Sequence, residues 1–193
     1  PFHYRNNAVS HVSGQGNNTV CGFYAAKSHE NIPAQDCVIC SEINPKIIDA
    51  VREYIKKYNL DAKSKGNGSI EQIFTRTAFN TGETMVVSSI GKAGVPDREE
   101  LVDMIRNAEN SVLSVILDNG KERTVFGSNV ITDYIGGIKF EISADSFFQV
   151  NPVMTQRLYK TAIEYAAVDR DTSIMDIYCG IATISLCAAK KAK

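Results

Sequence analysis

The feature that most constrains the fold is a short apolar run near the C-terminal end that leads through a turn into a helix-forming stretch. Ser173 to Tyr178 has the composition of a buried strand, Gly180 lies in the turn, and a helix is expected from Thr183. In α/β domains such a turn opens a nucleotide-type cofactor site, because backbone N–H groups and a helix N-terminus face the ligand. A turn with one glycine is equally typical of an ordinary strand-to-helix connection. The sheet that should follow is missing, so we expect the chain to be a piece of a longer protein.

The composition is that of an ordinary globular protein. Of the 193 residues, 44% are hydrophobic and 22% are charged, as in soluble domains. No apolar stretch approaches the ~20 residues that a membrane span needs, and no signal peptide is visible. Five cysteines without framework spacing indicate a reducing, cytoplasmic compartment. A net charge of -1 argues against a strongly basic nucleic-acid module, although it allows a local basic patch.

Hairpin-connected strands and intervening helices alternate over the first three quarters of the chain. Helices are expected from Asn44-Pro45, with Asn44 as the cap, and from the capping pair Asp97 and Glu100. Strands are expected at residues 2–9, 20–26, 70–79, 84–90, 112–117, 131–135 and 138–142. This pattern predicts an antiparallel α+β domain over residues 1–144.

The pattern changes after residue 144. Asn151-Pro152 opens a helix that runs to about Ala167, with an apolar side formed by Leu158, Ala162 and Ala166. With the strand at 173–178 and the helix from Thr183, the order is helix–strand–helix, which is typical of a doubly wound sheet. Residues 145–193 are therefore predicted to be the N-terminal piece of a Rossmann-like α/β domain.

A second informative stretch is Asp145-Ser146-Phe147-Phe148-Gln149-Val150-Asn151-Pro152. Gln149 can both donate and accept hydrogen bonds, and Phe147 could stack on a flat base. Taken alone, the octet is better explained by a core phenylalanine and a helix-entry residue.

Together the two stretches are much more specific. The octet, a helix and the sequence from Asp176 to Leu186 resemble the RNA uracil-5-methyltransferases of the RumA/TrmA type. The resemblance covers essentially the whole chain, because it extends upstream through residues 4–8, 22–24, 28–29, 32–33, 37 and 131–136.

This resemblance implies that the parent protein binds S-adenosylmethionine. Gln149 and Tyr178 match cofactor contacts of the family, and Gly180 and Thr183 match the turn near the methionine part of the cofactor. The implied substrate is a uridine in RNA, in 23S ribosomal RNA rather than transfer RNA, with Arg5 and Phe147 as candidate RNA contacts. No membrane and no protein partner is implied.

The family's chemistry implies that no catalytic residue lies in this chain. A cysteine thiolate adds to C6 of uracil, the enolate takes the methyl group, and a base removes the C5 proton. Both residues are expected in motifs beyond Lys193, so the 193-residue chain is expected to be inactive by itself. Cys179 lies within the cofactor turn and Cys187 on an apolar helix, so neither is the expected nucleophile.

Many family members carry a four-cysteine iron–sulfur cluster, and Cys37 matches its fourth ligand. The other three would precede Pro1, so this chain alone is expected to hold Cys37 as a free thiol and no cluster. A zinc or redox site of Cys37 and Cys40 with Cys21 and His29 is a weaker alternative, because a lone CxxC lacks its second pair.

Two positions depart from the family pattern. Ala182 stands where a second glycine is usual, and a Cβ there could crowd the cofactor or force a strained backbone angle. Asn7 stands where a lysine that could meet phosphate is common. Two other functions remain open: a non-catalytic RNA-binding module with the sheet as platform, and an unrelated enzyme with an adenosine cofactor.

Overall fold

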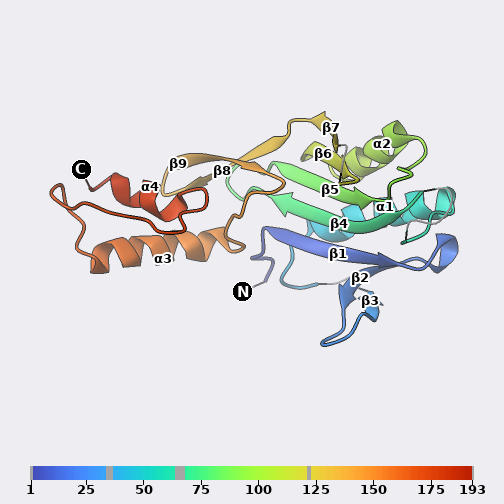
Figure 1. Ribbon diagram of the computed structural model, residues 1–193, viewed down its shortest axis with the longest axis horizontal. Coiled ribbons are helices and arrows are strands. Elements are labelled where there is room, and N and C mark those ends of the chain that lie inside the picture. The colour runs from blue at the N-terminus through green and yellow to red at the C-terminus, as the bar shows by residue number, and fades with distance from the viewer. Residues whose placement is uncertain (1, 34–36, 64–67, 121–122, 193) are drawn as a thin grey trace.

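The computed structural model describes residues 2–33, 37–63, 68–120 and 123–192, and its main element is a seven-stranded sheet (Figure 1). The strand order is β3-β2-β1-β4-β5-β6-β7. The bounds are β1 Asn7–Ser13, β2 Val20–Tyr24, β3 Asn31–Pro33, β4 Ile70–Thr77, β5 Thr84–Ile90, β6 Val112–Asp118 and β7 Arg123–Gly127. Neighbouring strands are antiparallel, except that β5 and β6 are parallel. A short 3-10 turn, Gly16–Asn18, connects β1 to β2.

Two helices, α1 (Ile43–Lys57) and α2 (Arg98–Ala108), pack on the sheet and form the first apolar core (Figure 1). The apolar positions of α1 recur at helical spacing, so one stripe of the helix is buried against the strands. The Asp97 side chain accepts the N–H of Glu100 at the start of α2, which confirms the predicted cap. Because α2 crosses over from the end of β5 to the start of β6, these two strands run parallel.

A separate hairpin of β8 (Val130–Ile135) and β9 (Ile138–Ser143) begins the second apolar core. Gly136 and Gly137 form its turn with φ values of 58° and 73°, so the predicted two-residue hairpin is confirmed. The core joins apolar residues of this hairpin to β5, β6 and the chain that follows: Met85, Val87, Ile116, Ile131, Ile135, Phe140, Ile142, Phe148 and Tyr159.

One buried carboxylate fixes this hairpin to the main sheet. Asp133 of β8 is fully buried and accepts the backbone N–H groups of Phe79 and Asn80, each at 3.0 Å, and of Tyr134 at 2.8 Å. Phe79 and Asn80 lie in the turn between β4 and β5. The hairpin therefore docks through charge-assisted hydrogen bonds as well as apolar contact.

Helices α3 (Pro152–Tyr165) and α4 (Thr183–Ala189) lie at the opposite end of the molecule from α2 (Figure 1). The Asn151 side chain accepts the N–H of Met154 at 3.0 Å, which confirms the predicted start of α3. The predicted apolar side was wrong at Leu158, which is 63% exposed, and at Ala166, which is also exposed, whereas Ala162 is half-buried. The side that packs inward carries Pro152, Thr155, Tyr159 and Ile163. Across the described ranges, every helix is too short or too polar to traverse a bilayer.

The predicted strand from Ser173 to Tyr178 does not form. In the described part of the chain this extended segment pairs with no strand, and Ile174, Met175 and Ile177 are 44%, 85% and 70% exposed. A buried parallel strand needs hydrogen-bonded neighbours on both edges, and none of the described strands lies along it.

Further details differ from the sequence expectation. The first strand begins at Asn7 rather than residue 2, because the N–H groups of His3 and Arg5 bond to the carbonyls of residues 38 and 39 instead. Asn44 is not the cap of α1, since Glu42 occupies that position and the Asn44 side chain accepts the Thr75 hydroxyl. Strands β3 and β7 were not predicted.

The predicted fold class was an antiparallel α+β domain followed by the first helix–strand–helix of a Rossmann-like α/β domain. The sheet and the two later helices confirm it, except that the strand between those helices does not form. The boundary near residue 144 remains a prediction. The second apolar core contains residues from both sides of it.

Candidate functional site

In the turn between Tyr178 and Thr183, every second residue has a positive φ. The φ values are 66° at Tyr178, 57° at Gly180 and 60° at Ala182. Only glycine adopts this region without strain, so two of the three positions carry strain that surrounding structure must hold in place. Strain of this kind concentrates at ligand-binding turns, where backbone N–H groups must point at a bound group.

Of the two consequences expected of an alanine at position 182, the strained backbone angle is observed. Ala182 lies at the N-cap of α4 with φ 60° and ψ 31°, a left-handed conformation. The backbone of Ala182 is therefore in a conformation that the side-chain methyl group disfavours. Gly180, by contrast, has open space around the position of an added Cβ, so its role in this turn is conformational.

Thr183 joins the turn to α3. Its hydroxyl lies 2.7 Å from the Tyr159 hydroxyl, and Tyr159 is buried in the second apolar core. Asp176, just before the turn, has a buried carboxylate oxygen, Oδ2, without a hydrogen-bond partner in the described part of the molecule. A buried oxygen of this kind is suited to a donor from a ligand, because an unsatisfied acceptor is costly.

The other predicted stretch lies at the start of α3. Phe148 is 2% exposed and packs in the second core, whereas Phe147 is 71% exposed and free to stack on a partner. Gln149 is half-buried, and its backbone carbonyl accepts a hydrogen bond from the Asn6 side chain at 2.9 Å. Gln149 lies two residues before the cap Asn151, and Thr183 contacts Tyr159 about two turns further along the same helix. Helix α3 thus connects the two predicted halves of the site.

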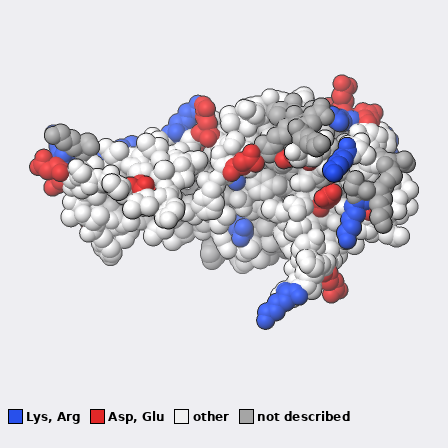
Figure 2. Space-filling model, viewed as in Figure 1, with Lys and Arg blue, Asp and Glu red and all other residues white. Residues whose placement is uncertain are grey.

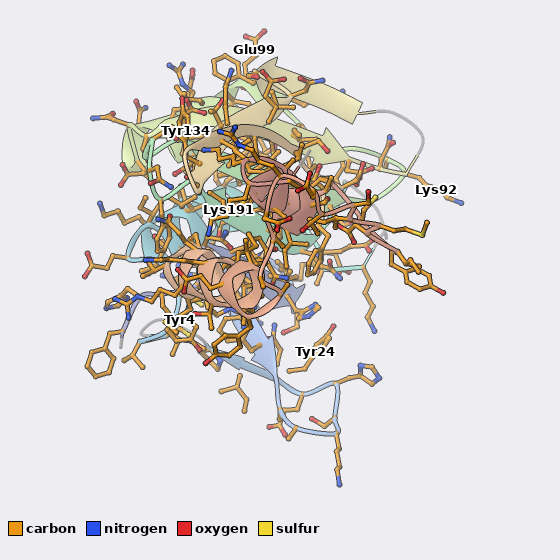
Figure 3. The ribbon with its side chains drawn as sticks, turned by 90° about the vertical axis from the view of Figure 1, so that its left-hand side faces the viewer. Tyr4, Tyr24, Lys92, Glu99, Tyr134 and Lys191 are labelled. Carbon is orange, nitrogen blue, oxygen red and sulfur yellow. The ribbon has the colours of Figure 1, made fainter. Side chains whose placement is uncertain are left out.

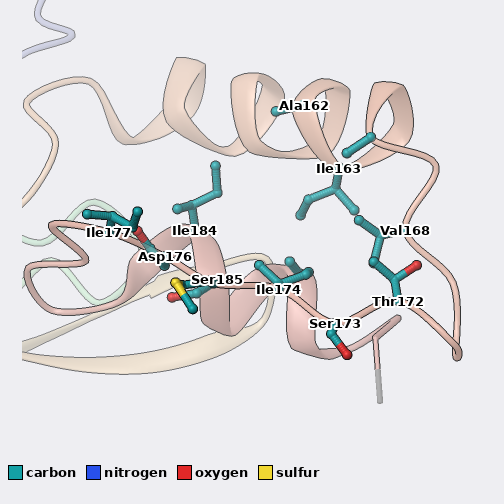
Figure 4. Close-up of a pocket in the computed structure, with 13 residues that line it drawn as sticks. Ala162, Ile163, Val168, Thr172, Ser173, Ile174, Asp176, Ile177, Ile184 and Ser185 are labelled. Carbon is teal, nitrogen blue, oxygen red and sulfur yellow. The ribbon is translucent and has the colours of Figure 1, made fainter.

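A pocket of about 480 Å³ lies between α3, the extended segment and α4 (Figure 4). Ile163, Ile174 and Ile184 line it from these three elements, and Asp176 and Ser185 supply polar atoms at its wall. It is mainly apolar, with few polar groups, as small-molecule sites are.

Arg5 and Cys37 come together away from the turn, in a second pocket of about 360 Å³ beside β1. Burial opposes ionisation of Cys37, but hydrogen bonds from Ile39 and Cys40 and the charge of Arg5 outweigh it, and the pKa of Cys37 is lowered. Burial and the neighbouring Cys37 raise the pKa of Cys40 to about 12. Cys37 is therefore the thiol of this pair that ionises more easily.

Among the described residues, no three His, Cys, Asp or Glu side chains gather closely enough to hold a metal ion. Burial raises the pKa of Cys187, whose thiol lies 3.7 Å from the Ile135 carbonyl, as expected of a packed cysteine. Cys179 is exposed and its thiol lies 3.7 Å from the Gly180 carbonyl.

Charges are mixed on the surface. On the face in Figure 2, Lys and Arg side chains are interspersed with Asp and Glu among the described residues. This agrees with the net charge of -1.

Sequence reasoning missed two residues that support the site. Asn6 and Arg76 are 2% and 5% exposed, and both donate to backbone carbonyls of the stretch from Ser143 to Val150. Asn6 precedes β1 and Arg76 lies near the end of β4, and in the sequence their polar side chains give no signal that they are buried.

The chain is similar over its whole length to curated bacterial proteins. It is 37% identical over 204 residues to an uncharacterized RNA methyltransferase of Caldanaerobacter subterraneus subsp. tengcongensis. It is 36% identical over 205 residues to an uncharacterized RNA methyltransferase of Clostridium tetani. Each comparison covers 100% of this chain and 45% of the relative, so the chain spans about half the length of these proteins. No protein-family model matches the chain.

The fold is similar to that of the Pyrococcus abyssi tRNA (uracil-54, C5)-methyltransferase, solved in complex with S-adenosyl-L-homocysteine. The TM-score is 0.77 over 98% of this chain and 47% of that protein, at 19% sequence identity. At this identity the likeness concerns the fold. The sequence similarity to the bacterial proteins makes the chain a relative of RNA methyltransferases along its whole length.

Proposed function

We propose that this chain is part of an enzyme that transfers a methyl group from S-adenosylmethionine to C5 of a uridine in RNA. The observation that carries the proposal is the strained turn from Tyr178 to Ala182, which helix α3 connects to Gln149 through the Tyr159–Thr183 hydrogen bond. The turn exposes Tyr178 completely, which leaves its ring free to cover an adenosine or ribose.

In this proposal four residues hold the cofactor. Tyr178 and Gln149 contact it with a ring and an amide, and Gly180 and Thr183 bring the backbone of the turn close to its methionine part. The residues present fit such a group, since Tyr178, Gly180 and Ala182 have positive φ values and, within the part of the chain that the structure describes, Asp176 Oδ2 has no hydrogen-bond donor. The bound cofactor would supply an electrophilic methyl group.

The nucleophilic cysteine and the base would lie outside these 193 residues. Cys187 is packed with a raised pKa, and Cys179 is part of the turn, which supports this assignment. We therefore expect the 193-residue chain alone to be inactive.

The RNA would be recognised by Arg5 and the exposed Phe147. We propose ribosomal RNA as the target, on the resemblance of the sequence motifs, and the cytoplasm as the compartment, which the five free cysteines support. Methylation of ribosomal but not transfer RNA transcripts by the longer protein would support this choice, and the reverse would contradict it.

Cys37 could supply one thiolate to an iron–sulfur cluster. Its lowered pKa and its place beside a pocket fit such a role, and the remaining ligands would have to come from outside the described residues. We also propose that the methyltransferase domain begins near residue 145, after the β8–β9 hairpin.

Calorimetry on the longer protein that contains this chain tests the proposal. Gln149→Ala should weaken S-adenosylmethionine binding about tenfold, which corresponds to one lost hydrogen bond of about 1.4 kcal/mol. Gln156→Ala is the matched control, because Gln156 is a glutamine only seven residues further along the chain, at an exposed position of α3.

Unchanged binding in Gln149→Ala would contradict the assignment. RNA binding without any S-adenosylmethionine binding would instead support a non-catalytic RNA-binding module. Cofactor binding without methyl transfer to RNA would point to an unrelated adenosine-cofactor enzyme.

A further inference from the structure

Asn6, the residue just before β1, makes an unusual set of contacts with the segment that carries Gln149. Its backbone N–H donates to the Val150 carbonyl at 2.8 Å, and its side-chain Nδ2 donates to the Gln149 carbonyl at 2.9 Å. Its own carbonyl accepts the N–H of Thr77 at 2.8 Å. One buried residue thus connects two consecutive peptide groups of the segment to the main sheet.

The other end of the same segment is attached nearby. Arg76 of β4 donates from Nη1 to the Ser143 carbonyl at 2.8 Å, and its guanidinium lies 5.0 Å from the centre of the Phe74 ring. Arg76 pairs with Asn7 in the β1–β4 register, so Asn6 and Arg76 lie at neighbouring places on the sheet. The chain from Ser143 to Val150 is therefore a loop whose two ends are bound to one spot.

The contact fixes the orientation of Gln149. Phe148 on one side is buried in the second core, and Asn151 on the other side caps α3. The carbonyl of Gln149 between them accepts the hydrogen bond from Asn6 Nδ2, which restricts rotation of this peptide group and thereby the direction in which the side chain leaves the backbone. Pre-orienting a binding residue in this way raises affinity because less freedom is lost on binding.

We propose that Asn6 is a positioning residue for Gln149, through which the start of the central sheet sets the affinity of the cofactor site. The inference rests on the proposed function, in which Gln149 contacts S-adenosylmethionine. Asn6 itself touches the backbone of Gln149 and is assigned no contact with the cofactor.

Asn31 provides a matched control. Its Nδ2 also donates to backbone carbonyls, those of His11 at 2.8 Å and Val20 at 3.0 Å. Like Asn6, it has a buried Oδ1 without a partner in the part of the chain that the structure describes. Asn31 pairs with Tyr24 on the arm of β2 and β3. Figure 3 shows Tyr24 on this arm, well below Lys191 beside α4.

The test is a double-mutant cycle in the longer protein, with S-adenosylmethionine binding measured by calorimetry. Asn6→Ala should weaken binding about five- to tenfold, and Asn31→Ala should leave it unchanged within about twofold. In the Gln149→Ala background, Asn6→Ala should weaken binding by less than about twofold, because the side chain that it positions is gone.

A general loss of structure would weaken binding equally in both backgrounds, and that outcome would overturn the inference. Asn6→Asp is the second variant, because it keeps the volume and places an oxygen against the Gln149 carbonyl. It should weaken binding at least as much as Asn6→Ala. Binding at the wild-type level in both folded Asn6 variants would overturn the inference, whereas unchanged binding in Gln149→Ala would contradict the proposed function instead.

Discussion

At the scale of single residues, Ala182 carries the clearest conflict between local preference and observed conformation. A non-glycine residue in the left-handed region is disfavoured by about 1–2 kcal/mol, and Ala182 is held there at φ 60°. The next residue, Thr183, shares a hydrogen bond with the hydroxyl of the buried Tyr159, and this contact helps to hold Ala182 in that conformation.

Ala182→Gly should therefore stabilise the protein. The relief of backbone strain outweighs the greater conformational entropy that glycine gives the unfolded chain. The free energy of unfolding should therefore rise by about 0.5 kcal/mol. Urea unfolding measures it. Ala162→Gly, within helix α3, is the control and should destabilise by about 1 kcal/mol. Destabilisation by both substitutions would show that the turn does not hold Ala182 under strain.

At the scale of elements, α1 and α2 are linked by a carboxylate at the end of α2. Glu109 accepts from Lys46 Nζ of α1 at 2.8 Å and from the N–H of Ser111 at 3.3 Å. The hydrogen bond from Lys46, with those from Ser111, lowers the pKa of Glu109. The link is therefore strongest when Glu109 is ionised.

The resulting pH dependence has a defined sign. Because the folded pKa of Glu109 lies below the unfolded value of about 4.3, its stabilisation is complete above that value and is lost as pH falls through the lower folded pKa. Glu109→Gln should make unfolding free energy less steep in pH below about 4.5, measured by urea titrations at several pH values. Glu99→Gln, at an exposed position of α2, is the control. A slope identical to wild type in Glu109→Gln would refute the link.

Elements with a local signal were predicted well from the sequence. Asp97 and Asn151 are caps with short-range geometry, and Gly136-Gly137 encodes its own turn. Elements that depend on distant partners were not. The composition of Ser173 to Tyr178 predicts a strand, but a strand forms only beside neighbouring strands, and the residues of this segment do not specify those neighbours. Asn6 and Arg76 act through contacts across roughly 70 to 140 positions, which single-sequence patterns do not reveal.

At the scale of the whole molecule, the segment from Ser173 to Tyr178 exposes a group of apolar side chains. Ile174, Met175 and Ile177 are exposed, and contiguous exposed apolar side chains favour association with other chains. We expect the isolated 193-residue chain to self-associate at micromolar concentration, and Met175→Lys combined with Ile177→Lys to reduce this association. Light scattering after gel filtration measures it. Leu158→Lys, an exposed apolar position on α3, should have a smaller effect. A monomeric wild-type chain would contradict the expectation.

The backbone amides that donate to the Asp133 carboxylate can report on the docking of the β8–β9 hairpin. Three backbone amide protons, on Phe79, Asn80 and Tyr134, converge on one buried anion. Protons in charge-assisted hydrogen bonds have distinctive NMR resonances and exchange slowly when buried. These three amides come from both sides of the contact between the β8–β9 hairpin and the main sheet. Their signals therefore report whether that contact persists when the proposed cofactor or RNA is added.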